Sequence, residues 1–226
     1  YLGGLVLIGD FLYLASRKKL TRPKELLNQP AKMKLTLFLS SFAVVILTLS
    51  YGNYKFNHPE VRQVDIQVGK SAGKMDSVRI AMVGDLHLGY LINRDDAQRM
   101  VDLIMEQEPD LILFVGDILD SSIEPVQGQR MDEELRRLQA PLGVYSCTGN
   151  HEYRYEAERK IQWLNDAGIK MLRDSAVLID SAFYVVGRED FVFSDRLPLS
   201  EILNRQNVNV SKPVIVLNHK IGRAHV

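Results

Sequence analysis

The sequence predicts an α/β domain that is built on a parallel sheet and preceded by transmembrane α-helices. From residue 76 onward, short apolar runs alternate with segments whose apolar residues recur at helical spacing. The first three of these runs each end at a glycine. Before them, residues 1–57 contain two long apolar stretches. The order strand, helix, strand, helix, strand is typical of a parallel sheet covered by helices.

The length, net charge and cysteine content of the chain limit the number of domains and the kinds of partner that can be expected. Its 226 residues suffice for one sizeable core, or for one domain with an appendage. The formal net charge is zero, so a nucleic-acid partner held by a basic face is not predicted. A single cysteine, Cys147, excludes an intrachain disulfide, and we expect this residue to be buried.

Residues 1–57 are predicted to form a membrane region with two transmembrane helices. Residues 35–51 have no charged side chain over 17 positions, the lower limit for crossing a bilayer at about 1.5 Å per residue. Residues 1–15 are nearly as apolar but contain Asp10, and we interpret them as the end of a truncated helix. A cleaved signal peptide and a pair of buried core helices are the alternatives.

The loop between the two apolar stretches predicts the orientation of the chain in a membrane. It contains one acid, Glu25, and seven basic residues: Arg17, Lys18, Lys19, Arg22, Lys24, Lys32 and Lys34. Basic loops stay on the cytoplasmic side. We therefore expect a multi-pass protein of the cell membrane, in which the domain that follows is extracytoplasmic.

The domain is predicted to begin with one strand and one helix. Residues 78–83 have the pattern of a buried strand and end at Gly84. A helix should begin at Asn93, a typical N-cap, with Asp96 three residues further on. The apolar face of this helix consists of Ala97, Met100, Val101 and Ile104.

The later elements complete the predicted domain. Residues 111–115 and 143–148 are predicted strands, each followed by a helical pattern. Residues 176–180 and 183–187 are separated by a tight turn, which predicts an antiparallel pair, and 214–217 is another buried strand. We therefore assign the linker to 58–75 and the domain to 76–220.

Side chains that can bind metal ions follow four of the predicted strands. They are Asp85 and His87 after the first, Asp117 after the second, Asn150, His151 and Glu152 after the third, and His219 after the last. Taken singly, Asp85-x-His87 and Gly116-Asp117 are more typical of turns and His219 of a cap or a core histidine, whereas Gly149-Asn150-His151-Glu152 has little structural reason to follow a buried strand. Because the carboxyl ends of parallel strands meet at one edge of a sheet, the whole set predicts one shared site.

The types of these side chains indicate which metals they would bind. Mixed carboxylate, imidazole and amide ligands suit Mn²⁺, Fe²⁺ or Zn²⁺ rather than a cysteine-based structural zinc. One carboxylate can bridge two such ions about 3.5–4 Å apart. A metal pair of this kind holds a hydroxide at neutral pH and neutralises the oxygens of a phosphate under attack.

These motifs resemble those of the calcineurin-like metallophosphoesterase superfamily. The resemblance rests on Asp85-x-His87, Gly116-Asp117, Gly149-Asn150-His151-Glu152 and Asn218-His219. Within the superfamily, the chain is similar to the bacterial membrane-associated branch, over about residues 58–220. The resemblance implies a sandwich of two mixed sheets flanked by helices.

The resemblance also implies a role for each residue of the site. Asp85 and His87 would hold the first metal ion, and Asn150 and His219 the second. Asp117 would bridge the two ions.

Two further roles follow from the same resemblance. His151 would contact the phosphate and protonate the leaving group as a general acid, and it would not bind metal. Glu152, where many relatives have aspartate, would orient His151.

The last motif of the superfamily, a Gly-His-x-His turn, does not occur in this sequence. Residues 221–226 match the translation of a common sequencing adapter, and we expect them to be a non-native tail. His225 is therefore given no role. We interpret the chain as a fragment truncated at both ends.

The function predicted from these observations is metal-dependent hydrolysis of phosphomonoesters or phosphodiesters. It would use a dinuclear metal centre and a metal-bound hydroxide. A membrane tether favours a lipid-linked substrate. The alternative is a membrane-anchored, non-catalytic binding or sensor protein on the same fold, whereas a nuclease is disfavoured by the neutral charge.

Overall fold

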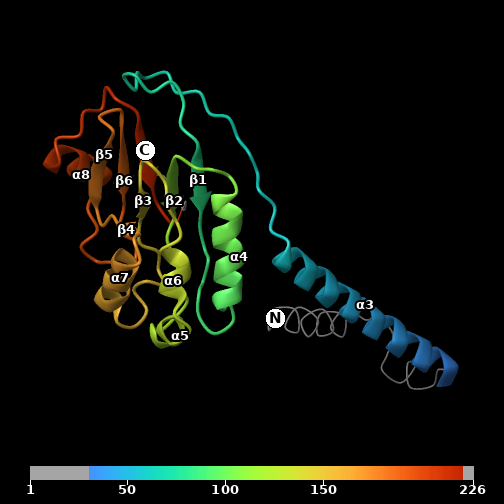
Figure 1. The fold of residues 1–226 in the computed structure, drawn as a ribbon. Helices are drawn as coiled ribbons and strands as arrows, with labels where there is room; N and C mark the ends of the chain where they lie inside the picture. Colours follow the sequence, from blue (N-terminus) through green and yellow to red (C-terminus); the bar gives the residue numbers. More distant parts are fainter. Residues whose placement is uncertain (1–30, 221–226) are drawn as a thin grey trace, which may run out of the picture. The chain divides into compact units, whose positions relative to one another are not determined.

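The computed structural model describes residues 31–220, which divide into two compact units between Asp65 and Ile66 (Figure 1). The described part of the first unit contains one helix, α3, Ala31–Asn57. The predicted helix over 1–15 and the predicted tail over 221–226 lie outside the described residues.

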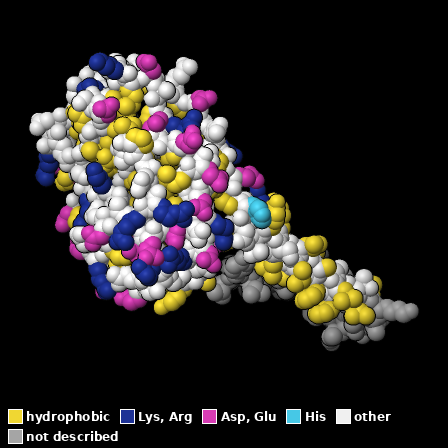
Figure 2. Space-filling view, in the orientation of Figure 1, with side chains coloured by type: hydrophobic (Ala, Val, Ile, Leu, Met, Phe, Trp, Pro, Cys, Tyr) yellow, Lys and Arg dark blue, Asp and Glu magenta, His cyan; other side chains and the backbone are white. Residues whose placement is uncertain are grey.

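The helix α3 carries large apolar side chains on its surface, among them Phe38, Phe42 and Leu47 (Figure 2). Residues 35–51 are helical, as the sequence predicted. Within residues 31–220, however, no helix is long and apolar enough to cross a membrane. The transmembrane helix predicted over 35–51 is therefore not confirmed.

The first sheet of the second unit is entirely parallel. Its strands lie in the order β1-β2-β3-β4, and they are β1 Ile80–Val83, β2 Leu111–Phe114, β3 Val144–Ser146 and β4 Lys170–Met171. The helices that connect them are α4 Arg94–Met105, α5 Glu124–Gly128, α6 Met131–Leu135 and α7 Ala157–Asp166. The predicted order of strands and helices is confirmed, while β4 and α5 were not predicted.

The helix α4 begins at the predicted cap. The side chain of Asn93 accepts hydrogen bonds from the backbone N–H groups of Asp95 (2.8 Å) and Asp96 (3.2 Å). The carboxylate of Asp96 accepts the N–H of Asn93 in return (2.8 Å). This capping box satisfies donors that have no partner within the helix and fixes where the chain leaves the loop after β1.

The second sheet is mixed. It has the order β5-β6-β7, with β5 Ser175–Ile179, β6 Phe183–Gly187 and β7 Val214–Leu217. The strands β5 and β6 pair antiparallel, as predicted, and β6 pairs parallel with β7. A further helix, α8, spans Leu199–Arg205. The predicted sandwich of two mixed sheets is corrected in one respect, because the four described strands of the first sheet are all parallel.

The strand β2 lies between two hydrophobic clusters. Ile112 and Phe114 belong to the cluster that contains the helices α4 and α6. Leu111 and Leu113 belong to the cluster shared with the second sheet. Because successive side chains of a strand point to opposite faces, one strand can serve both cores. The two sheets therefore pack on each other, with helices on the outer face of the first.

Cys147 lies in the cluster between the sheets and is fully buried. Burial is the main cause that raises the pKa of its thiol to about 12. The thiol is therefore protonated at neutral pH and behaves as a small core side chain, as predicted. The end of the predicted linker also packs on this cluster, through Ala72 and Met75.

Candidate metal centre

The predicted site residues follow strands of both sheets. Asp85 and His87 come after β1, Asp117 after β2, and Asn150 and His151 after β3. His219 comes after β7, which belongs to the second sheet. The site therefore lies at the carboxyl edge of strands from both sheets.

The carboxylate of Asp117 is the centre of the site. Its Oδ2 atom lies 3.2 Å from Nε2 of His219, 3.8 Å from Nε2 of His87 and 3.9 Å from Nε2 of His151. Its Oδ1 atom accepts the backbone N–H of His151 (2.8 Å). The Asp117 side chain is only 4% exposed. A single buried carboxylate thus faces three imidazole rings.

Two groups of potential ligands share Asp117. One consists of His87, Asp117 and His151, and the other of Asp85, Asp117 and His219. In each group the ligand atoms lie within 4.8 Å of one another. The structure therefore brings together five of the residues that the sequence singled out. One group combines Asp85 with His219, and the other combines His87 with His151, which the resemblance left outside the ligand set. Nε2 of His87 also lies 3.7 Å from Oδ1 of Asp85, so the two residues predicted to share one ion are close together as well. The assignment of ligands to each ion stays a prediction.

The spacing of these atoms suits a metal ion. Ligand atoms that bind one ion at about 2.0–2.2 Å lie roughly 3–4 Å from one another. The three distances from Asp117 Oδ2 fall between 3.2 and 3.9 Å, and those to His87 and His151 are longer than an ordinary hydrogen bond. Oxygen and nitrogen donors at this spacing fit a divalent cation of the Mn, Fe or Zn type.

Three of the candidate ligands have a left-handed backbone conformation. The φ angles are 55° at Asp85, 51° at His87 and 50° at Asp117. Such a conformation costs about 1–3 kcal/mol per residue outside glycine, and it persists only where the surroundings enforce it. Here the N–H of Asp85 donates to the carbonyl of Gly116 (3.3 Å) and that of His87 to Asp117 (3.0 Å). The loops after β1 and β2 hold each other in this arrangement.

Two glycines allow the loops after β2 and β3 to touch. A Cβ atom on Gly149 would lie 2.1 Å from Oδ1 of Asp117, and one on Gly116 would lie 2.6 Å from the nitrogen of Gly149. Gly116 also has a positive φ of 78°. The glycines that end the predicted strands are therefore required by the close approach of the two loops.

Glu152 is completely buried and holds the loop that carries Asp117. Its carboxylate accepts four backbone N–H groups, from Asp117 (2.8 Å), Ile118 (2.9 Å), Leu119 (3.2 Å) and Gly149 (2.7 Å). The carboxylate is thus turned towards backbone N–H groups of the loops after β2 and β3, and its predicted role of orienting His151 stays a prediction. These bonds fix Asp117 relative to the loop after β3.

Asp120 orients His151, a contact that was not predicted. The ring Nδ1 of His151 donates to the backbone carbonyl of Asp120 and lies 3.1 Å from its Oδ1. A carbonyl oxygen only accepts, so Nδ1 carries a proton and Nε2 points towards Asp117. The signal in the sequence was an acid three residues after Asp117, in the same loop.

His219 is oriented in a similar way. Its Nδ1 donates to the backbone carbonyl of Val115 (2.8 Å), which leaves the lone pair of Nε2 directed at Asp117. Metal-binding histidines are commonly fixed by such a bond from the other ring nitrogen. The side chain of His219 is 7% exposed. The predicted residue thus has the tautomer that a ligand needs.

Asn150 lies between two anchored neighbours. The N–H of Gly149 donates to Glu152 (2.7 Å) and that of His151 to Asp117 (2.8 Å). Asn150 itself is half-buried. Its backbone position is therefore set by hydrogen bonds that also involve Glu152 and the Asp117 carboxylate.

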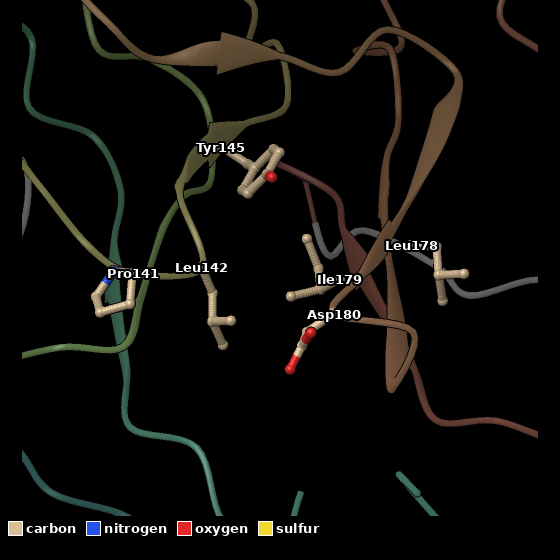
Figure 3. Close-up of a pocket in the computed structure, with 6 residues that line it drawn as sticks. All are labelled: Pro141, Leu142, Tyr145, Leu178, Ile179 and Asp180. Atoms are coloured by element: carbon tan, nitrogen blue, oxygen red, sulfur yellow. The ribbon is translucent and has the colours of Figure 1, made fainter. Parts of the chain in front are cut away.

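A cavity of about 260 Å³ lies elsewhere in the domain (Figure 3). It is lined by Pro141, Leu142, Tyr145, Leu178, Ile179 and Asp180. Pro141 and Leu142 precede β3, whereas each candidate ligand follows the strand that carries it. The cavity contains none of the predicted site residues.

The chain is similar to a known protein family and to several individual proteins. The family model described as Calcineurin-like phosphoesterase matches residues 78–223. An uncharacterized metallophosphoesterase of Aquifex aeolicus is 30% identical over 186 residues, which are 78% of this chain and 68% of that protein. A transmembrane protein with metallophosphoesterase domain from Danio rerio is 33% identical over 118 residues, 52% of this chain and 26% of that protein.

A third relative is named for an enzymatic activity. The UDP-2,3-diacylglucosamine pyrophosphatase LpxG of Chlamydia trachomatis is 24% identical over 155 residues. The match covers 66% of this chain and 46% of that protein. The chain thus spans less than half of the length of two of these three relatives.

Proposed function

Because the chain belongs to the calcineurin-like phosphoesterase family, we propose that it hydrolyses phosphomonoesters or phosphodiesters at a dinuclear metal centre around Asp117. The observation that carries this proposal is that one buried carboxylate is common to both groups of potential ligands. A shared carboxylate is the usual way in which a protein holds two ions close together.

The proposed ligands are Asp85, His87, Asp117, Asn150 and His219. Asp117 would bridge the ions, since its Oδ2 faces histidines of both groups. Two bound divalent ions, of the Mn, Fe or Zn type, would supply the positive charge that lowers the pKa of water and neutralises a phosphate under attack. The hydrogen bond from the Asp117 backbone to Glu152 and the one from the His219 ring to Val115 would hold these two ligands in position.

His151 is the proposed general acid. Its Nδ1 is held by Asp120, so its Nε2 faces the space beside Asp117 where a phosphate would bind. To donate a proton from Nε2, the ring must carry protons on both nitrogens. The Asp120 carboxylate, 3.1 Å from Nδ1, is a suitable partner for that form of the ring. A leaving alkoxide is the group that would take the proton.

The substitution Asp117→Asn tests the proposed centre. The amide keeps the shape of the side chain but removes the charge that two ions would share, so we expect hydrolysis of bis(4-nitrophenyl) phosphate to fall by at least about 100-fold. Bound metal, measured by mass spectrometry, should fall as well.

Asp76→Asn is the matched control, because Asp76 is exposed and lies before β1. It should retain both activity and metal. Full activity of the Asp117→Asn variant would refute the proposed centre.

The proposed substrate class is a phosphate ester linked to a lipid. Its support is the similarity to LpxG, which is named for a diacylated nucleotide sugar, and the apolar stretches that precede the domain. We expect kcat/KM for a phosphodiester with acyl chains to exceed that for the same head group without chains by at least about tenfold. Equal values for the two substrates, measured in detergent below and above micelle formation, would contradict this class.

The extracytoplasmic location remains a prediction. It rests on the basic residues of the segment 17–34 and on the positive-inside rule.

A further inference from the structure

Lys160 is a completely buried lysine that the proposed chemistry does not use. It lies on α7, close to the start of that helix. Lysine is almost never fully buried unless its charge has partners, because an ammonium loses strongly favourable hydration when it leaves water. Burial is the main cause that lowers the pKa of Lys160, and Glu152, Asp117 and Asp120 act in the opposite direction.

The ammonium group of Lys160 binds two loops of the site. It donates to the backbone carbonyls of Ser121 (3.1 Å), His151 (2.5 Å) and Arg154. Ser121 belongs to the loop after β2, whereas His151 and Arg154 belong to the loop after β3. An ammonium has three N–H donors, and all three are used here.

The pair formed by Asp120 and His151 joins the same two loops. Asp120, which contacts Nδ1 of the ring, immediately precedes Ser121 in the chain. Lys160 binds the carbonyl of His151 itself. The distance between the ring and its partner therefore depends on how closely the two loops approach each other, and Lys160 holds them together next to this contact.

We propose that Lys160 is a positioning residue for proton donation by His151, an inference that rests on the proposed function. Lys160 is buried, so it would act through the backbone rather than on the substrate. Without its ammonium, three carbonyls that converge on one point would lose their donors and the loops would separate. Nε2 of His151 would then no longer have a fixed direction.

The experiment compares leaving groups in the full-length, metal-loaded protein. General acid catalysis matters for a poor leaving group such as phenol and hardly matters for 4-nitrophenol, which leaves without a proton. We expect Lys160→Met to lower kcat for an aryl phosphodiester with a phenol leaving group by about 10- to 100-fold. With 4-nitrophenol the loss should be less than about threefold.

His151→Gln is the benchmark, and it should show the same dependence on the leaving group with a larger loss. Lys74→Met is the matched control, because Lys74 is exposed and outside the site, and it should leave both rates unchanged. Equal losses for both leaving groups in Lys160→Met would mean that Lys160 only stabilises the fold, which overturns the inference. No loss with either leaving group overturns it as well.

A spectroscopic measurement keeps the inference testable without turnover. The ¹⁵N chemical shifts of the His151 ring report which nitrogen carries the proton. At a pH where the ring is neutral, we expect the wild type to carry the proton on Nδ1 and Lys160→Met to show a mixture of tautomers. Lys160→Gln, which retains two N–H donors, serves the same comparison if the methionine variant does not fold.

An unchanged tautomer in the folded variants would overturn the inference. A wild-type protein that hydrolyses none of the aryl phosphodiesters would instead count against the proposed function, and the ring shifts would still test Lys160. The two failures are thus distinguishable.

Discussion

Gly149 has no side chain at the point where the loop after β3 passes the carboxylate of Asp117. A Cβ atom there would lie 2.1 Å from Asp117 Oδ1 and 2.4 Å from its nitrogen. The same Oδ1 accepts the N–H of His151. At the scale of single residues, the direction of the Asp117 carboxylate thus depends on the absence of a side chain at Gly149.

Gly149→Ala should therefore damage both stability and metal binding. The added methyl group must displace Asp117, and we expect a loss of about 1–3 kcal/mol in the free energy of unfolding. Metal affinity, measured by titration calorimetry, should fall with it. Gly128→Ala is the control, because a Cβ atom there meets nothing within 4 Å, and it should change stability by less than about 0.5 kcal/mol. Unchanged stability and affinity in Gly149→Ala would contradict this account.

At the scale of elements, the loops that follow β1, β2 and β3 are held in place by different side-chain hydrogen bonds. The cap at Asn93 fixes where the loop after β1 turns into α4. Glu152 and Lys160 fix the loops after β2 and β3, one through four backbone N–H groups and the other through three carbonyls. In the same pair of loops, the carboxylate of Glu152 thus accepts backbone N–H groups and the ammonium of Lys160 donates to backbone carbonyls.

Asn93→Ala tests the contribution of the cap to the stability of α4. Removing the side chain leaves the N–H groups of Asp95 and Asp96 without their acceptor, and we expect a loss of about 1 kcal/mol in the free energy of unfolding. Asn204→Ala, at an exposed position inside α8, should be neutral or slightly stabilising. Urea unfolding of both variants provides the measurement, and a loss that is equal in the two would contradict the assigned cap.

At the scale of the whole molecule, the site depends on the packing of two sheets. Asp117 follows a strand of the first sheet and His219 a strand of the second, yet Oδ2 and Nε2 lie 3.2 Å apart. The hydrogen bond from His219 to Val115 crosses between the sheets in the same place. The cluster that includes Leu113, Val185 and Leu217 holds these strands together. The candidate metal centre therefore depends on the packing of both sheets and is not formed by either sheet alone.

The sequence by itself indicated the order of the main strands and helices, without β4 and α5, and the types of side chain that follow the strands. Buried strands appear as apolar runs, amphipathic helices as a 3.6-residue period, and the cap at Asn93 as a local pattern, because each depends on neighbours in the chain. The glycines and the acid, amide and imidazole side chains that follow the strands were visible for the same reason. The proposed ligand set came from these local signals together with the family resemblance.

Only the tertiary structure decided which groups of different loops meet. Glu152 binds N–H groups up to 35 positions away, Asp120 contacts His151 from 31 positions away, and Lys160 reaches Ser121 over 39 positions. No local pattern distinguishes such a buried charge from a solvated one. The partners of these charges are set by how closely two loops approach, and that approach follows from the packing of the strands and helices that carry them.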